Sequence, residues 1–274
     1  MVKIVTFGNF KGGTGKTTNS CLVAYQLSKK GKKVLVADLD PQANATSLFL
    51  NTKQAQTNEV IKFDTTLMSA ISNNDLSPIL TEIKENLYLL PSFADFTSYP
   101  LFLEKKYPNS QKDRALHFSK LLEPIKDEFD YIIIDTPPTV SLFTDSALMA
   151  SDDVVLVLQT QERSYAGCEA FIEYLNELII NYDADYKIAG ILPVLLKNNS
   201  QVDKMILQEA EKQFHKSNMF ENIVKNMERL KRYDIIGIVD QDCKAQKHDM
   251  HDRRVNALYS KITDEFIERV ENDG

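Results

Sequence analysis

The feature that most constrains this chain is a glycine-rich segment, KGGTGKTT, at residues 11–18. A short apolar run at residues 2–7 precedes it, and a helical pattern at residues 19–30 follows it. Glycines let successive backbone N–H groups turn toward one anion without a Cβ clash, and the N-terminus of a helix adds a partial positive charge. This order of elements predicts a phosphate-binding loop between a buried strand and a helix.

The residue types within the segment predict which groups contact a nucleotide. Lys16 is expected to reach the terminal phosphates, and the Thr17 hydroxyl is expected to ligate Mg²⁺. The general pattern G-x-x-x-x-G-K-[ST] is met at its end, but its first glycine falls on Phe10, and a second lysine, Lys11, heads the loop instead. The predicted nucleotide-binding residues of the loop are Lys11, Gly12, Gly13, Thr14, Gly15, Lys16, Thr17 and Thr18.

Short apolar runs alternate with helical patterns along the rest of the chain. The predicted strands after the first are residues 34–37, 87–90, 131–134, 154–158 and 188–196, and the further predicted helices are residues 111–126, 166–180, 202–215 and 253–270. Continuous Val, Ile and Leu runs between helices are typical of a parallel sheet covered on both faces. We therefore expect a doubly wound, mainly parallel α/β fold of the P-loop NTPase type.

Two further features refine this expected fold. Pro193 lies within the last predicted strand, which indicates an edge position or a bulge, and Pro124 should end the helix at residues 111–126 early. No linker, repeat or low-complexity tract interrupts residues 1–274, so we expect a single domain.

Three carboxylates follow predicted strands. Asp38 and Asp40 come after the second strand, and Asp135 comes after the strand at residues 131–134. In a parallel sheet the carboxyl ends of the strands meet at one edge, where ligands bind. A carboxylate fixed there lies near the phosphate loop, so each is a candidate for contact with Mg²⁺ or the terminal phosphate. The alternative for each is a carboxylate that only caps a loop.

Three segments together resemble the ParA/MinD family of deviant Walker A ATPases. They are the loop KGGTGKTT, the segment DLDPQAN at residues 38–44, and the strand end YIIIDTPP at residues 131–138. Their order and spacing also match that family. Within it, the sequence most resembles the short plasmid-partition ParA, or Soj-like, type.

The resemblance implies catalytic and metal-binding roles. It implies that Lys11 reaches across a dimer to the phosphates of the partner's nucleotide, much as an arginine finger does. It also implies that Asp40 positions or polarises the attacking water, and that Asp135 supports the Mg²⁺ shell through a water. The expected catalytic residues are Lys11, Lys16 and Asp40, and the expected metal-site residues are Thr17, Asp40 and Asp135. Asp38 is expected to support these metal-site residues without contacting the metal itself.

The base-contacting residues of the family fall here after a late strand. The corresponding positions are Lys197, Asn198 and Asn199, of which Asn198 is our candidate for a nucleotide contact. A loop that contains Asn-Asn is equally typical of a plain turn.

Basic residues gather late in the chain. The formal net charge of −7 argues against a protein that coats nucleic acid with its whole surface. Local contact with DNA phosphates, without base readout, is the functional interpretation, and a solvated helix face diluted by nearby aspartates is the alternative. Lys225, Arg229 and Arg232 have the spacing of one helix face. The predicted DNA-contacting residues are Lys225, Arg229, Lys231, Arg232, Lys244, Lys247, Arg253 and Arg254.

The resemblance leads us to expect a ParA-like DNA-partition ATPase. Such a protein would bind Mg-ATP, form an ATP-dependent homodimer and bind double-stranded DNA nonspecifically. It would hydrolyse ATP weakly until a small centromere-binding adaptor, ParB-like or ribbon-helix-helix, stimulates it. Because the chain starts almost directly at the first strand, we do not expect sequence-specific operator binding.

Three other functions stay open at this point. A MinD-like positioning ATPase binds membrane through a basic amphipathic helix, whereas residues 263–274 here are acidic and would be repelled by anionic lipid. A nucleotide-gated interaction switch and an ATP-dependent metabolic enzyme of the same superfamily are the others. Widely spaced cysteines, no signal peptide and no apolar stretch of about 20 residues favour a cytoplasmic protein without a membrane partner. The resemblance to ParA implies that it is nucleoid-associated.

Overall fold

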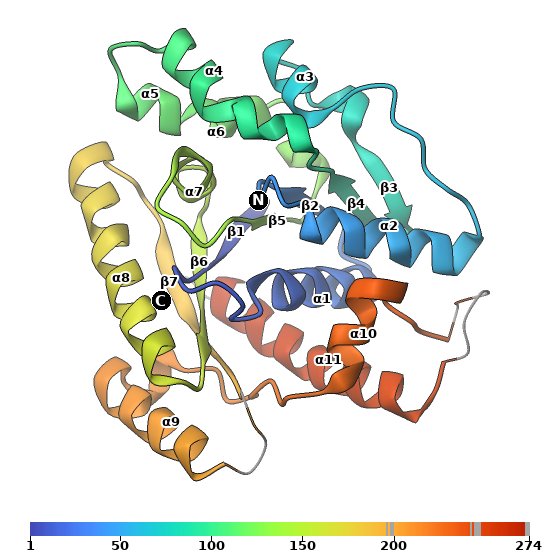
Figure 1. The fold of residues 1–274 in the computed structure, drawn as a ribbon, viewed down its shortest axis with the longest axis vertical. Helices are drawn as coiled ribbons and strands as arrows, with labels where there is room; N and C mark the ends of the chain where they lie inside the picture. The colour runs from blue at the N-terminus through green and yellow to red at the C-terminus, as the bar shows by residue number, and fades with distance from the viewer. Residues whose placement is uncertain (196, 198–199, 242, 244–247, 272–274) are drawn as a thin grey trace.

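A sheet of seven strands lies at the centre of the molecule, with helices on both of its faces (Figure 1). The computed structural model describes residues 1–195, 197, 200–241, 243 and 248–271. The strands are β1 Lys3–Gly8, β2 Val34–Asp38, β3 Thr81–Lys84, β4 Leu87–Leu90, β5 Tyr131–Asp135, β6 Asp153–Gln159 and β7 Lys187–Val194. Their order is β3-β4-β2-β5-β1-β6-β7, and every neighbouring pair is parallel except β3 with β4. This is the doubly wound, mainly parallel fold that the sequence predicts.

The helices close the core around this sheet. They are α1 Lys16–Lys29, α2 Asn44–Thr57, α3 Leu67–Ser72, α4 Tyr99–Lys106, α5 Gln111–Ala115, α6 His117–Leu122, α7 Leu142–Leu148, α8 Glu162–Tyr182, α9 Gln201–Phe214, α10 Glu228–Ile236 and α11 Met250–Glu271. The buried residues of α1, α2, α10 and α11 form one cluster with the sheet. Those of α3, α4 and α6, with Ala147 of α7, form a second, and those of α8 and α9, with Leu148 of α7, form a third with β6 and β7.

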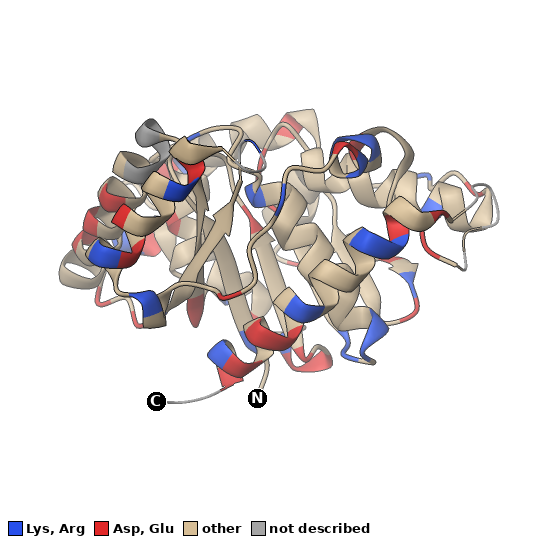
Figure 2. Ribbon diagram, turned by 90° about the horizontal axis from the view of Figure 1, so that it is seen from below, with Lys and Arg blue, Asp and Glu red and all other residues tan. Residues whose placement is uncertain are grey.

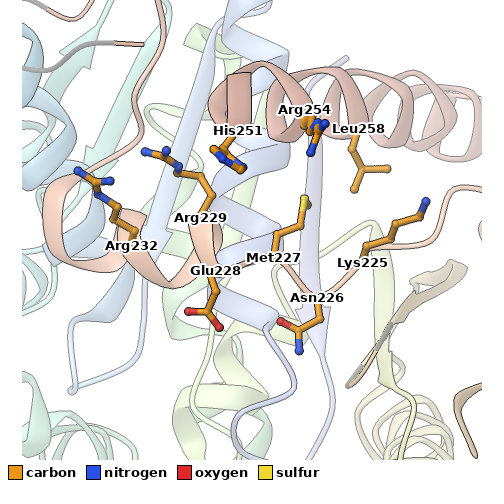
Figure 3. Close-up of a pocket in the computed structure, with 9 residues that line it drawn as sticks. All are labelled: Lys225, Asn226, Met227, Glu228, Arg229, Arg232, His251, Arg254 and Leu258. Atoms are coloured by element: carbon orange, nitrogen blue, oxygen red, sulfur yellow. The ribbon is translucent and has the colours of Figure 1, made fainter. Parts of the chain in front are cut away.

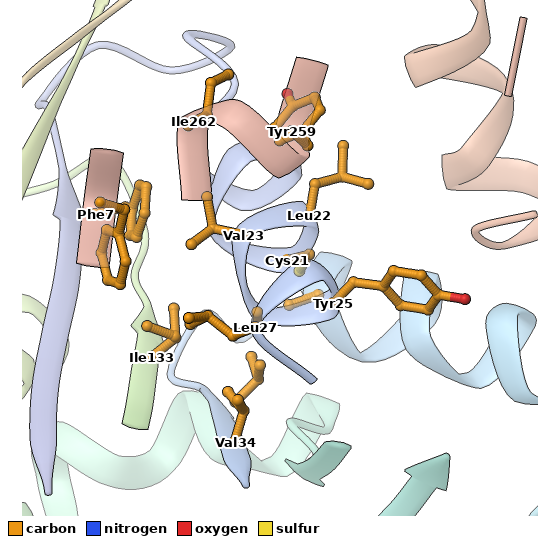
Figure 4. Packing of buried hydrophobic residues seen from close by; sticks show 14 of the residues in the cluster. Phe7, Cys21, Leu22, Val23, Tyr25, Leu27, Val34, Ile133, Tyr259 and Ile262 are labelled. Atoms are coloured by element: carbon orange, nitrogen blue, oxygen red, sulfur yellow. The ribbon is translucent and has the colours of Figure 1, made fainter. Parts of the chain in front are cut away.

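Side chains alternate between the two faces of a strand, so a strand covered on both faces contributes to two clusters. In β1, Val5 and Phe7 belong to the cluster with α1 and α11, whereas Ile4 belongs to the cluster on the opposite face. Figure 4 shows Phe7 of β1, Val23 of α1 and Tyr259 of α11 in the first cluster, where all three are almost fully buried. The helix that follows the phosphate loop is therefore fixed between the sheet and α11.

Pro193 and Pro124 have the structural effects that the sequence predicts. β7, which contains Pro193, is an edge strand, and its register with β6 shifts between Val154 and Val155. The helix expected at residues 111–126 is instead two short helices, α5 and α6, that end before Pro124. The elements that the sequence analysis did not predict are α2, α3, α4, α7, α10 and β3.

Candidate nucleotide site and basic groove

The glycine-rich segment joins the end of β1 to the start of α1, as predicted. Gly13 and Gly15 have φ of 73° and 91°, a region that residues with a Cβ rarely adopt. Gly15 is the N-cap of α1, and it has no side chain to bond the first N–H groups of the helix. The N-terminus of α1 therefore has its backbone donors and the positive end of the helix dipole in an arrangement that suits an anion.

Side chains on both sides of the loop hold it in place. The Asn9 Oδ1 accepts from the Lys11 N–H at 2.8 Å, and the Lys16 Nζ donates to the Lys11 carbonyl at 3.3 Å. At the other end, the Asn19 amide donates to the Gly15 carbonyl at 2.7 Å and accepts from the Tyr259 hydroxyl at 2.8 Å. The last helix of the chain thus braces the loop through Asn19.

A cavity of about 540 Å³ opens over this loop. Besides residues 13–18, it is lined by residues that follow β2 and β5, which are Asp40, Gln42, Asn44, Ser47, Thr136 and Pro138, and by Asp234 of α10. The structure therefore brings the predicted Lys16, Thr17 and Asp40 into one site at the carboxyl ends of the strands. Burial lowers the pKa of Lys16, and the nearby carboxylates of Asp135 and Asp40 oppose that shift.

Asp135 lies directly beneath Thr17. The Thr17 hydroxyl donates to the Asp135 Oδ2 at 2.8 Å, and the buried Oδ1 of the same carboxylate has no hydrogen-bond partner among the described residues. Burial, together with the charge of Asp38, raises the pKa of Asp135 to about 8. A buried carboxylate oxygen without a partner is costly, and a cation or a metal-bound water above Thr17 would remove that cost.

An Mg²⁺ ion fits this donor set. A hydroxyl beside a carboxylate offers only oxygen ligands, and Mg²⁺ keeps several waters and phosphate oxygens in its shell. In the described part of the chain no group of three or more His, Cys, Asp or Glu side chains is arranged to hold a metal by itself. The arrangement therefore suits an ion that arrives with a phosphate ligand.

Asp38 and Asp40 have different surroundings although they lie two residues apart. Asp38 is fully buried and accepts from the Thr46 N–H at 2.8 Å, from the Thr46 hydroxyl at 2.7 Å and from the Asp40 N–H at 3.1 Å. Burial raises its pKa to about 6. Asp38 thus fixes the segment between β2 and α2, whereas Asp40 lines the cavity and accepts from the Gln42 N–H at 2.9 Å.

A smaller cavity of about 220 Å³ adjoins the loop on its other side. Gly15, Thr18 and Asn19 form one wall. The other walls come from the ends of β6 and β7, from the segment before α10 and from α10 itself, and their residues are Gln159, Val194, Leu195, Val224, Lys225, Asn226, Met227, Leu230, Lys231 and Asp234. The sequence analysis predicted none of these wall residues as a nucleotide contact, and it assigned Lys225 and Lys231 to DNA instead. Among the residues suggested for base contact, Asn198 and Asn199 lie outside the described residues, and Lys197 is exposed, with its N–H 3.0 Å from the Asp203 carboxylate.

A groove of about 800 Å³ lies between α10 and α11. Its lysine and arginine side chains come from three parts of the chain, with Lys225 before α10, Arg229 and Arg232 on α10 and Arg254 on α11, and Glu228 adds one acidic side chain (Figure 3). Met227 and Leu258 give it an apolar surface. Acidic and basic segments are otherwise interspersed over the helices (Figure 2), so this groove is a local feature.

The predicted basic residues separate into groups in the structure. Lys225 precedes α10, so it is not on a helix face with Arg229 and Arg232 as the spacing suggested. Arg229 bonds the Asp249 carboxylate and lies 3.5 Å from that of Asp252, and its side chain is only 10% exposed. Arg229 therefore joins α10 to the start of α11 and offers little surface to a ligand.

Two of the other predicted cations, Lys231 and Arg253, do not line the groove. Lys231 lines the small cavity and pairs with Glu228 at 3.1 Å. Arg253 is exposed on α11 but does not line the groove. Lys244 and Lys247 lie outside the described residues.

Comparison with known proteins assigns this chain to a family. A protein-family model described as an AAA domain matches residues 2–188. The sporulation initiation inhibitor protein Soj of Bacillus subtilis (strain 168) is 30% identical over 230 residues, which cover 84% of this chain and 87% of Soj. This chain belongs to the ParA/Soj family of ATPases.

Two further similarities agree with that assignment. The chromosome partitioning protein ParA of Myxococcus xanthus (strain DK1622) is 31% identical over 228 residues, covering 83% of this chain and 77% of that protein. The ATP complex of McdA from Cyanothece has the same fold, with a TM-score of 0.77 at 18% identity over 100% of this chain and 98% of that chain. The predicted family and fold are confirmed, and as a ParA/Soj family member the chain is an ATPase. None of its described helices has both the length and the hydropathy that crossing a bilayer requires.

Proposed function

We propose that this ParA/Soj family member is a DNA-partition ATPase that binds Mg-ATP in the cavity over the phosphate loop. The observation that carries the proposal is the convergence of Lys16, Thr17 and Asp40 on one cavity at the uncapped N-terminus of α1, with the unpartnered Asp135 oxygen beneath Thr17. Three phosphates match this mixture of backbone donors, one buried lysine and a hydroxyl. The adjoining small cavity, whose walls combine apolar side chains with polar ones such as Gln159 and Asn226, suits the base.

Each side chain then has a distinct task. Lys16 would neutralise the terminal phosphates, and Thr17 would ligate Mg²⁺ while Asp135 holds that ligand sphere through a water. Asp40, held by the Gln42 N–H, would orient the attacking water beside the terminal phosphate. Mg²⁺, when bound, supplies positive charge that stabilises the transferring phosphoryl group.

We extend the proposal to an ATP-dependent homodimer in which Lys11 reaches the partner's phosphates. In support, the Lys11 backbone is fixed at the rim of the site by Asn9, and the loop after β5 exposes Val140, which is 62% accessible. An exposed apolar side chain beside a polar active site suits burial against a second copy. Charge supplied from the partner would stabilise the transition state as an arginine finger does.

DNA is proposed to bind the groove between α10 and α11 through its phosphates. Lys225, Arg232 and Arg254 supply the charge, and a dimer would present two such grooves to one duplex. Avidity of this kind explains how a chain of net charge −7 binds DNA only when ATP pairs it. A centromere-binding adaptor that stimulates hydrolysis completes the proposed cycle.

Mobility shift of random-sequence DNA tests the proposal, with ATP and with ADP over a range of salt concentrations. Binding that requires ATP and weakens steeply with salt is the expected result. Equal binding with either nucleotide, or none with ATP, would refute the DNA role. Pelleting with anionic liposomes instead of a DNA shift would replace it with the MinD-like function.

A further inference from the structure

The start of the phosphate loop contacts α8 through Phe10. Phe10 stands where the general loop pattern has its first glycine, and its ring packs edge-on against Phe171 at 4.8 Å and Tyr174 at 5.3 Å between centroids. A Cβ added to Gly8 would lie 2.3 Å from the Phe171 ring, so β1 also approaches α8 closely at this point. The start of the loop is therefore seated on two aromatic rings of one helix.

Tyr174 also bonds a second element of the site. Its hydroxyl donates to the Asp145 carboxylate of α7. α7 begins directly after residues 136–141, the segment that follows Asp135 and carries the cavity residues Thr136 and Pro138. The Thr144 hydroxyl donates to the Thr139 carbonyl at 2.7 Å, which ties this segment to α7. α7 and α8 lie on the same side of the sheet (Figure 1), and Leu148 of α7 belongs to the same buried cluster as residues of α8.

We infer that Tyr174 is a positioning residue, which sets the distance between the start of the phosphate loop and the segment after Asp135. Its ring contacts Phe10 on one side and its hydroxyl holds Asp145 on the other. This inference rests on the proposed function, because it assigns Tyr174 a role in placing groups around Mg-ATP. Tyr174 itself does not line the cavity.

The two halves of the site depend on Tyr174 to different degrees. Binding of the phosphates relies mainly on the N-terminus of α1, which Asn19 and Tyr259 brace independently. Hydrolysis also needs Asp135 and the water site at the right distance from the loop. Loss of the hydroxyl should therefore slow hydrolysis more than it weakens ATP binding.

Tyr174→Phe tests this inference, because it keeps the ring against Phe10 and removes only the hydroxyl. The matched control is Tyr182→Phe on the same helix, whose hydroxyl donates to Gln111 at 3.2 Å outside the cavity. Asp145→Asn is the conservative partner variant, since its amide oxygen still accepts from Tyr174. The readouts are the dissociation constant for a fluorescent ATP analogue with Mg²⁺ and the single-turnover rate of ATP hydrolysis.

We expect Tyr174→Phe to slow hydrolysis about 3- to 10-fold and to change the dissociation constant less than about 2-fold. Asp145→Asn should retain most of the rate, and Tyr182→Phe all of it. A wild-type rate in Tyr174→Phe, or equal losses of rate and affinity, would overturn the positioning role. Wild-type protein that fails to bind the analogue would refute the proposed nucleotide site itself, so the two failures are distinguishable.

Discussion

The cavity over the phosphate loop takes its ligand-facing groups from backbone N–H donors and short side chains at strand ends, whereas the groove between α10 and α11 takes its groups from long cationic side chains. In the cavity, Lys16 is buried and Thr17 is bonded to a neighbour. In the groove, Lys225, Arg232 and Arg254 are exposed. The difference indicates one site that is preorganised for a defined ligand, and one that suits an extended, variable polyanion.

The largest effect should come from the cavity side of this comparison. Lys16→Ala removes the buried charge opposite the phosphates, so we expect ATP affinity to fall at least about 100-fold. Titration calorimetry with Mg-ATP measures it, and an unchanged melting temperature controls for folding. Retained ATP affinity in this variant would show that nucleotide binding in the cavity does not depend on Lys16.

Asp40→Ala should separate binding from chemistry within the cavity. Asp40 lines the cavity without bonding the loop, so ATP affinity should change little while hydrolysis slows about 100-fold. Phosphate release under saturating Mg-ATP is the measurement, and Asp38→Asn is a contrasting variant that should mainly lower stability. Unchanged turnover in Asp40→Ala would contradict the proposed water-orienting role.

Arg229 tests whether all cations near the groove serve it. Arg229→Met leaves the fully buried Asp252 without its cation, which should lower the free energy of unfolding by about 3 kcal/mol. Lys231→Met on the same helix breaks only an exposed pair and should cost less than about 1 kcal/mol. Urea unfolding compares the two. If Arg229→Met were as stable as wild type but bound DNA more weakly, the role of Arg229 would be DNA contact and not stabilisation of the fold.

A milder effect is expected on the pH dependence of stability, through Asp145 of α7. Burial raises the pKa of Asp145 to about 7, above the value of about 3.9 in an unfolded chain. Between these values the folded chain binds more protons, so this residue lowers stability as the pH rises from about 4 to about 7. Asp145→Asn should therefore raise the melting temperature relative to wild type more at about pH 8 than at about pH 5. An equal difference at both would contradict the shifted pKa.

The smallest effect should come from one groove cation. Arg254→Ala removes a single phosphate contact, so DNA affinity should fall about 3-fold and the slope of log K against log salt should decrease by about 1. Arg253→Ala is the matched control, because Arg253 is exposed on the same helix outside the groove. Equal losses in both variants would mean that net charge, and not the groove, determines binding.

The sequence predicted the cavity better than the groove for a physical reason. A phosphate loop needs glycines, a lysine and a hydroxyl at fixed spacing, so Lys16 and Thr17 were identifiable from the chain alone. Groove residues need only be cationic and close in space. Lys225 and Arg254 are 29 positions apart in the sequence, and only the packing of α10 against α11 brings them together.

The missed elements have a similar explanation. α2 begins at Asn44 in a stretch rich in Asn, Thr, Ser and Gln, and its helical form is fixed by packing on α10 and by the Asp38–Thr46 bonds at its start. α7 is only seven residues long, too short for a reliable periodic pattern. Buried strands such as β5 carry continuous apolar runs, so they were predicted almost to the residue.

The contact between Tyr259 and Asn19 spans 240 positions of the chain. During synthesis, the glycine loop and its helix leave the ribosome long before the helix that braces them. Until that last helix has been made, α1 lacks its cover, because a domain generally folds as a unit. Competence to bind nucleotide should thus be among the last properties that the newly made protein acquires, which would keep incomplete chains out of the ATP cycle.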